Sequence, residues 1–140
     1  MFFSDFVKKI LFILSVLILV CSISVTGLEY HNRESIDDIV STFKYGSSRD
    51  LARFFDNGID INISGIQGDY SKNQAEQVMR DFFKKFPPSD FTIVHKGNGT
   101  DLIINYIGNY KSDNSEFRVF IKGKKNDENI RIYSLDIVKA

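Results

Sequence analysis

The sequence predicts one α+β domain, in which helices cover one face of an antiparallel sheet, behind an N-terminal leader. Three observations lead to this prediction. Apolar residues recur at a spacing of three and four in the first half of the chain, as at Ile36, Ile39 and Phe43, which is typical of amphipathic helices. After Phe91, apolar and polar residues alternate in four short runs, which is typical of strands joined by tight turns. The chain has 140 residues and 13 Phe, enough for a single core of large side chains.

The first helix of the domain is expected at the apolar stripe formed by Ile36, Ile39, Val40 and Phe43. Gly46 follows this stripe at the place where a helix commonly ends with a residue in the left-handed conformation. Glycine adopts that conformation without steric cost, so we expect the helix to end there.

A second, shorter helix is expected directly afterwards. Ser47 offers an N-cap, and Asp50 places a negative charge in the first turn, where the helix dipole favours it. The apolar residues of this helix are Leu51, Phe54 and Phe55, and it is expected to stop at Asn57-Gly58. Strict alternation over residues 59–63 then predicts a strand, and residues 65–68 are expected to form a loop.

The third helix begins with a capping box at Ser71 and Gln74, in which each side chain satisfies a backbone amide of the other residue. Tyr70 and Ala75 occupy the positions of a hydrophobic staple. Pro87-Pro88 is expected to end the helix, because proline donates no backbone hydrogen bond. The apolar stripe of this helix consists of Ala75, Val78, Met79, Phe82, Phe83 and Phe86.

Four sequential strands make up the rest of the chain. They are expected at residues 91–96, 102–110, 117–124 and 130–138. The connections are short and polar, and Gly97-Asn-Gly99 is typical of a hairpin turn. Strands joined in this way form an antiparallel meander.

Residues 1–27 are expected to form a secretory signal peptide, followed by the domain at residues 28–140. Lys8 and Lys9 supply the positive n-region, and the apolar run over residues 10–20 supplies the h-region. A small-x-small cleavage site follows at Ser22-Ile-Ser24, with Val25-Thr-Gly27 as a second choice. The predicted location is therefore secreted or periplasmic.

Two alternatives for the leader stay open. The apolar run extends to Val25, which approaches the lower limit for a tilted spanning helix, so an uncleaved N-terminal membrane anchor is one alternative. Lipidation of Cys21 is the minority alternative, because the residue before it is Val20 and not a small residue. Contact with a membrane is expected only through an uncleaved leader.

Charge and cysteine content exclude several classes of protein. Removing residues 1–27 takes Lys8, Lys9 and Asp5 from totals of 18 basic and 18 acidic residues, which leaves 16 and 17. A domain with this balance and no basic run is not expected to bind nucleic acid. The chain has one cysteine, Cys21, which lies in the leader, so the mature domain is expected to have no disulfide.

The expected element order resembles that of the nuclear transport factor 2-like superfamily, also called cystatin-like or SnoaL-like. More narrowly, four motifs are similar to those of a family of small secreted bacterial proteins of unknown function. These are Tyr70-Ser-Lys-x-Gln-Ala75, Asp81-Phe-Phe83, His95-Lys-Gly97 and Phe117-Arg-Val119. The resemblance extends from about residue 33 to residue 138 and implies a curved sheet wrapped around the third helix. Superfamily members use the pocket beneath that sheet for catalysis, for ligand capture or as core, so the resemblance supplies no catalytic residue.

His95 is the main candidate for a functional side chain. If strict alternation holds, it shares a strand face with Phe91 and Ile93, where an imidazole is able to act as a general base. Tyr106 and Arg118, on the next two strands, would then converge with His95 on an acidic or polar ligand if their faces are concave. The alternative interpretation buries the neighbours of Arg118 and leaves its guanidinium in solvent, with His95 as an ordinary residue at a strand end.

Three functional hypotheses follow. The leading one is a non-catalytic protein that binds a small molecule or a partner protein through its cavity or sheet. The second is an isomerase or lyase with His95 as its base, and the third is an envelope protein that forms a homodimer through the outer face of its sheet. No cofactor is expected, and no metal site, because His31 and His95 are the only histidines and the acidic residues show no ligand spacing.

Overall fold

The computed structural model describes residues 2–21, 34–97, 100 and 102–140, which fall into two compact units, Met1–His31 and Asn32–Ala140. The described part of the first unit is one helix, α1 (Phe2–Cys21), which contains the predicted apolar run. Both predicted cleavage sites, Ser22-Ile-Ser24 and Val25-Thr-Gly27, lie outside the described residues. Within the described ranges, no helix is both long and apolar enough to cross a membrane.

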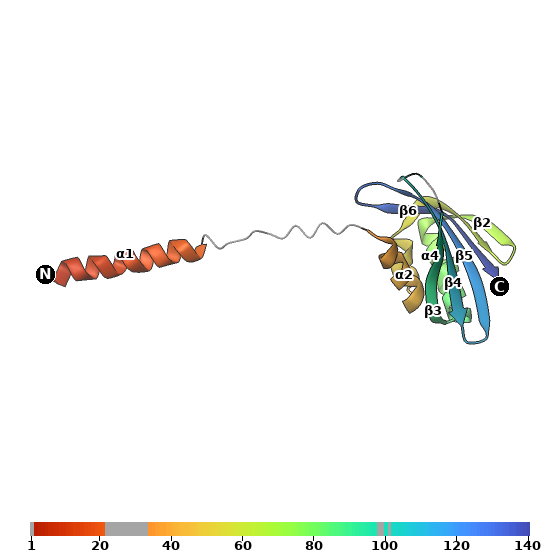
Figure 1. The fold of residues 1–140 in the computed structure, drawn as a ribbon, viewed down its shortest axis with the longest axis horizontal. Coiled ribbons are helices and arrows are strands. Elements are labelled where there is room, and N and C mark those ends of the chain that lie inside the picture. The colour runs from red at the N-terminus through yellow and green to blue at the C-terminus, as the bar shows by residue number, and fades with distance from the viewer. Residues whose placement is uncertain (1, 22–33, 98–99, 101) are drawn as a thin grey trace. The chain divides into compact units, whose positions relative to one another are not determined.

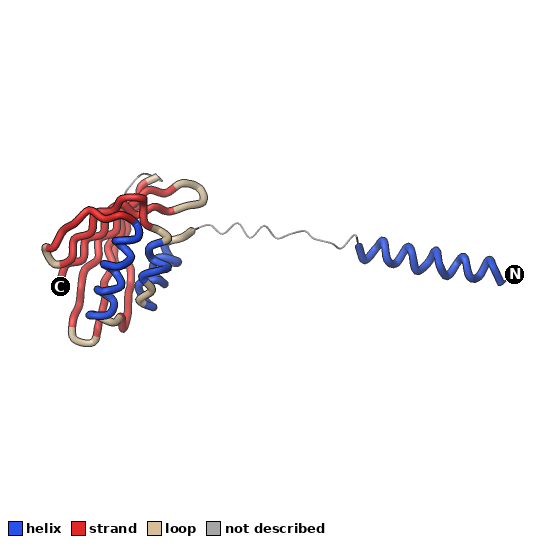
Figure 2. The backbone as a smooth tube through the Cα atoms, turned by 180° about the vertical axis from the view of Figure 1, so that it is seen from behind, coloured by secondary structure: helices blue, strands red, loops and turns tan. Residues whose placement is uncertain are grey.

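The second unit is an α+β domain with its helices on one face of a curved sheet, which confirms the predicted fold class (Figures 1 and 2). The helices are α2 (Ile36–Tyr45), α3 (Ser48–Ala52) and α4 (Lys72–Lys85). The strands are β1 (Phe55–Ile63), β2 (Ile66–Ser71), β3 (Pro88–Lys96), β4 (Ile103–Ser112), β5 (Ser115–Lys125) and β6 (Ile130–Lys139).

The sheet has six strands in the order β2-β1-β6-β5-β4-β3. The last four strands of the chain form the predicted antiparallel meander. β1 pairs with β6 in parallel, and this pair is the difference from the antiparallel sheet expected from the sequence. In the chain, β1 comes before α4 and the meander. The last strand of the meander, β6, returns to lie beside β1 and runs in the same direction, so the two strands pair in parallel.

The predicted helix starts and stops are largely confirmed. Gly46 ends α2 in the left-handed conformation with φ of 64°, and the Ser47 hydroxyl accepts the amide of Asp50 at the start of α3. The capping box of α4 is present, with Ser71 and Gln74 each accepting the backbone amide of the other.

The predicted second helix is too long. α3 ends at Ala52, and Phe55 begins β1 instead of closing the helix. The reason is tertiary: Phe55 pairs with Ile132 of β6, and its side chain is only 1 % exposed. The parallel pairing thus overrides the local helical pattern of residues 51–55.

β2 was not predicted, because residues 65–68 were expected to form a loop. Ser64 and Gly65, with φ of 50° and 91°, form a two-residue turn of the kind that joins hairpin strands. The chain therefore reverses within two residues, and Ile66 pairs with Ile63 directly after the turn.

Aromatic rings fill the space between the helices and the meander. Phe43 of α2 stacks on Phe91 of β3 with 4.5 Å between ring centroids, and Phe82 of α4 meets Phe117 of β5 at 5.2 Å. Gly108 lies under the ring of Phe91, so closely that a Cβ on this glycine would collide with the ring. The core is therefore closed by direct ring packing over the sheet.

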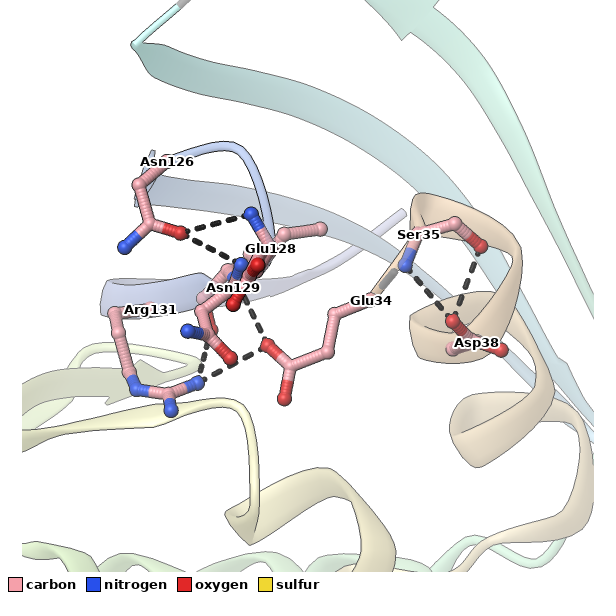
Figure 3. A network of polar contacts seen from close by, with 8 residues as sticks. Glu34, Ser35, Asp38, Asn126, Glu128, Asn129 and Arg131 are labelled. Atoms are coloured by element: carbon pink, nitrogen blue, oxygen red, sulfur yellow. Dashed lines mark hydrogen bonds and ion pairs between the residues drawn. The ribbon is translucent and has the colours of Figure 1, made fainter. Parts of the chain in front are cut away.

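A polar network attaches the start of the domain to the hairpin between β5 and β6 (Figure 3). One carboxylate oxygen of Glu34 accepts the amide of Ile130 at 2.7 Å and a guanidinium nitrogen of Arg131 at 3.1 Å. The amide of Glu34 donates to the carbonyl of Glu128 at 3.1 Å. These bonds hold the chain just before α2 against the sheet.

Candidate functional site: a groove between helix α4 and the β1–β2 hairpin

The structure places His95 away from the concave face. The register of β3 on β4 shifts between Ile93, which lies opposite Gly108, and His95, which lies opposite Ile107. This bulge at Val94 breaks the alternation on which the prediction depended. His95 is therefore exposed on the convex face, whereas Phe91 is buried on the concave one.

Tyr106 and Arg118 also lie on opposite faces of the sheet. Tyr106 is half-buried and packs against the core on the concave side, opposite Ile121. Arg118 lies opposite Asn109 on the convex side and is exposed, as the alternative interpretation expected. The three predicted residues therefore do not converge, and of the three only Tyr106 faces the helices.

A groove lies instead between α4 and the hairpin of β1 and β2, with a volume of about 280 Å³. Its surface is mainly aliphatic and aromatic. Its lining residues are Ile61, Ile63, Ile66, Tyr70, Val78, Asp81, Phe82, Lys85 and Phe86. Ile66 is 77 % exposed, so the floor of the groove is open to solvent. This volume suits an aromatic ring or a short aliphatic group better than a large ligand.

The shape of the floor depends on Gly68. A Cβ on Gly68 would lie 2.6 Å from the ring and the hydroxyl of Tyr70, so the ring lies along its own strand over the glycine. The staple contact between Tyr70 and Ala75 stays a prediction. The ring that suggested a helix staple in the sequence lines the groove, and the glycine two residues earlier was the signal that sequence reasoning missed.

The groove opens on the side of α4 that faces away from the other helices. Phe83 points toward α2, with 6.0 Å between its ring centroid and that of Phe43. Val78, Asp81 and Lys85 occupy the opposite flank of the helix, over the hairpin. Because β2 is an edge strand, the groove lies at the margin of the sheet.

Both signs of charge are present at the rim. Asp81 and Lys85 are exposed and one helical turn apart. The ammonium of Lys85 lies 5.5 Å from the ring centroid of Phe86, within the range of a cation–π contact. A ligand whose apolar group lies in the groove would therefore have the Lys85 ammonium and the Asp81 carboxylate within reach of its polar part.

A second pocket, of about 270 Å³, lies between α2 and α3, and most of its lining residues are polar. Its acidic residues already have structural partners. Asp38 closes the N-terminal box of α2 with Ser35, Asp50 accepts the hydroxyl of Ser47, and Glu34 pairs with Arg131. This pocket is best explained as the solvated junction of two helix starts.

Known proteins are similar to this chain over most of the domain. The chain matches the family model described as Domain of unknown function (DUF4783) over residues 36–138. No curated protein is significantly similar to the chain. A DUF4783 family protein from Bacteroides ovatus ATCC 8483 is 28 % identical, with a TM-score of 0.68 over 74 % of this chain and 93 % of that chain. Another, from Bacteroides uniformis ATCC 8492, is 25 % identical, with a TM-score of 0.71 over 76 % and 98 %.

More distant structures share the fold. An NTF-2 like protein of unknown function from Silicibacter pomeroyi DSS-3 is 14 % identical, with a TM-score of 0.53 over 75 % of this chain and 89 % of that chain. A domain of unknown function with a cystatin-like fold from Nostoc punctiforme PCC 73102 is 12 % identical, with a TM-score of 0.59 over 84 % and 80 %. These similarities confirm the nuclear transport factor 2-like fold that the sequence resembled.

Proposed function

We propose that this chain, which belongs to the DUF4783 family, is a non-catalytic binding protein that takes an apolar group of a ligand or partner into the groove between α4 and the β1–β2 hairpin. The observation that carries the proposal is the exposed isoleucine floor: Ile66 is 77 % exposed beside Ile63 and Val78 in a concave site. Covering such a surface is favourable, at roughly 25 cal/mol for each Å² of apolar area removed from water.

The arrangement of titratable groups supports binding over catalysis. Those of the groove are Tyr70, Asp81 and Lys85, and the last two are exposed at its rim. Catalytic acids and bases usually lie shielded from solvent in a cleft, whereas Asp81 and Lys85 are exposed. His95 lies on the convex face, so it is not available to this site as a base.

A titration with 4-phenylbutyrate, followed by nuclear magnetic resonance on the ¹⁵N-labelled protein, tests the proposal. The phenyl ring suits the floor, and the carboxylate suits Lys85. We expect saturable shifts at the amides of Ile63, Ile66 and Tyr70, and at least a tenfold weaker response in Val78→Glu, which places a charge in the groove. The matched control is Val94→Glu on the convex face, where Val94 is 50 % exposed. Equal responses in the two variants, or shifts confined to the convex face, would contradict the proposal.

The proposed location is secreted or periplasmic, with residues 1–27 as the export signal. Lys8 and Lys9 ahead of the apolar run support it, as does the position of Cys21, the one cysteine, outside the domain. Expression of the full chain followed by intact-mass measurement in each cell fraction tests it. Outside the cytoplasm we expect the mass of a chain that begins after residue 24 or 27. An intact chain in the membrane fraction would favour the membrane anchor instead.

A further inference from the structure

The two edges of the sheet differ in how they are protected against pairing with another strand. β3 begins with Pro88 and carries the bulge at Val94, and both features disfavour strand addition. β2 lies at the opposite edge (Figure 1). It contains no proline or lysine in its six residues and keeps an unbroken register on β1. β2 is therefore the edge that is open to a further strand.

The hairpin turn determines which backbone groups face outward. In a two-residue hairpin the pair next to the turn, Ile63 and Ile66, exchanges both backbone hydrogen bonds, and every second pair does the same. Gly68 and Tyr70 therefore bond to β1, and the amide and carbonyl groups of Gln67 and Asp69 point away from it. These groups are placed to pair with an added strand.

An added strand would deliver a side chain to the groove. A residue opposite Gly68 points to the same face as Gly68, which is the concave face beneath the flank of α4. Gly68 has no side chain, and the ring of Tyr70 covers it, so an incoming apolar group meets that ring and the floor beside Ile66. The edge and the groove thus form one continuous surface.

The convex side of the same edge favours a cation. Asp60 and Asp69 lie directly opposite each other on β1 and β2, which is an unfavourable pairing of like charges. The side-chain amide of Gln67 donates to both carboxylate oxygens of Asp60, at 3.1 and 3.0 Å. No described residue donates to the Asp69 carboxylate. A lysine or arginine on an added strand, opposite Asp69, would offset this charge.

We propose that β2 binds an extended segment of a partner polypeptide as an added strand, with an apolar side chain opposite Gly68 in the groove and a basic residue opposite Asp69. This inference rests on the proposed function and names the partner class. The partner is a different chain and not a second copy, because an antiparallel copy centred on Gly68 would place the neutral Gln67 opposite Asp69. A strand-added partner draws its affinity from main-chain bonds and its specificity from alternate side chains.

Selection from a library of random 12-residue peptides against the full chain tests the inference. We expect the enriched peptides to alternate between apolar and polar residues, with a basic residue next to an apolar one. Gln67→Pro removes an outward backbone amide and keeps the backbone bonds to β1, but it also loses the side-chain bonds to Asp60, so Gln67→Ala, which loses only those side-chain bonds, is its control. We expect Gln67→Pro, and not Gln67→Ala, to weaken the peptides at least tenfold while leaving 4-phenylbutyrate binding intact. Asp69→Asn is expected to keep binding but lower the preference for basic residues.

Three outcomes would overturn the inference: no enriched alternating peptide, unchanged peptide affinity in Gln67→Pro, or a wild-type dimer in light scattering that Gln67→Pro converts to monomer. The last outcome would identify a second copy as the occupant. Measuring both ligands on the wild type and on Gln67→Pro separates the two proposals. If the wild type binds the peptides but not 4-phenylbutyrate, only the small-ligand form of the proposed function fails, and if Gln67→Pro binds both as the wild type does, only the added strand fails.

Discussion

Replacing Tyr110 with phenylalanine tests how the C-terminal end of α4 is held. Tyr110 is 0 % exposed, and its hydroxyl donates to the backbone carbonyl of Phe86, the residue that caps α4. The rings around it are Phe43, Phe82, Phe83, Phe91 and Phe117. Phenylalanine keeps the ring in this cluster and removes only the hydrogen bond, so the substitution isolates that bond.

The expected loss of unfolding free energy is about 1.5 kcal/mol. A neutral hydrogen bond contributes about 1 kcal/mol net, and a buried carbonyl left without its donor adds to the loss. With a urea slope of about 1.5 kcal/mol/M, the midpoint of urea unfolding should fall by about 1 M. The control is Tyr45→Phe, because Tyr45 is 84 % exposed. If the two variants lose the same stability, the bond from Tyr110 does not hold the end of α4.

The stability difference between the wild type and Tyr110→Phe should also depend on pH in the alkaline range. Burial raises the pKa of the Tyr110 phenol well above its ordinary value of 10.0. Between that value and the raised pKa the unfolded chain loses this proton and the folded chain keeps it, so folding stability falls as pH rises, by up to about 1.4 kcal/mol per pH unit. The advantage of the wild type over Tyr110→Phe should be constant up to about pH 9 and should vanish at about pH 11. A constant advantage up to pH 11 would show that the phenol ionises alike in both states.

Two other substitutions test the packing and the polar network. Gly108→Ala places a Cβ against the fully buried ring of Phe91, and we expect a loss of about 2 kcal/mol in urea unfolding; unchanged stability would mean that the ring is free to move. Glu34→Gln weakens the bonds to Ile130 and Arg131, and we expect a loss of about 1 kcal/mol at low salt and less at high salt, because the pair is partly exposed. A midpoint that does not move at low salt would contradict this reasoning.

The parts of the fold that depend on neighbouring residues were predictable from the sequence. Gly46, Ser47 and the Ser71-Gln74 box work through local hydrogen bonds and backbone angles, which the sequence states directly. The apolar stripe of α4 and the alternation after Phe91 identify buried faces, because only one face of each element packs on the core. Element order then led to the fold class.

The candidate site was not predictable, because strand faces depend on register. One extra residue, Val94, turns His95 from the concave face to the convex one, and nothing in residues 91–96 marks the bulge. β2 was missed for a similar reason: a glycine at either end of residues 65–68 is typical of a loop, and only the pairing of Ile66 with Ile63 makes it a strand. Both errors concern contacts between strands, which residue order alone does not determine.

Two strand glycines determine the shape of the concave face. Gly108 receives the ring of Phe91 from a neighbouring strand, and this closes the concave face over the meander. Gly68 receives the ring of Tyr70 from its own strand, and because β2 is an edge strand, that ring shapes an open surface instead of a closed core. A side chain at position 108 would need a smaller residue at position 91, and the concave face would then open near Tyr106. A side chain at position 68 would instead push Tyr70 into the groove. The concave face is therefore closed where Phe91 covers Gly108 of β4, and it stays open where Tyr70 covers Gly68 of the edge strand β2.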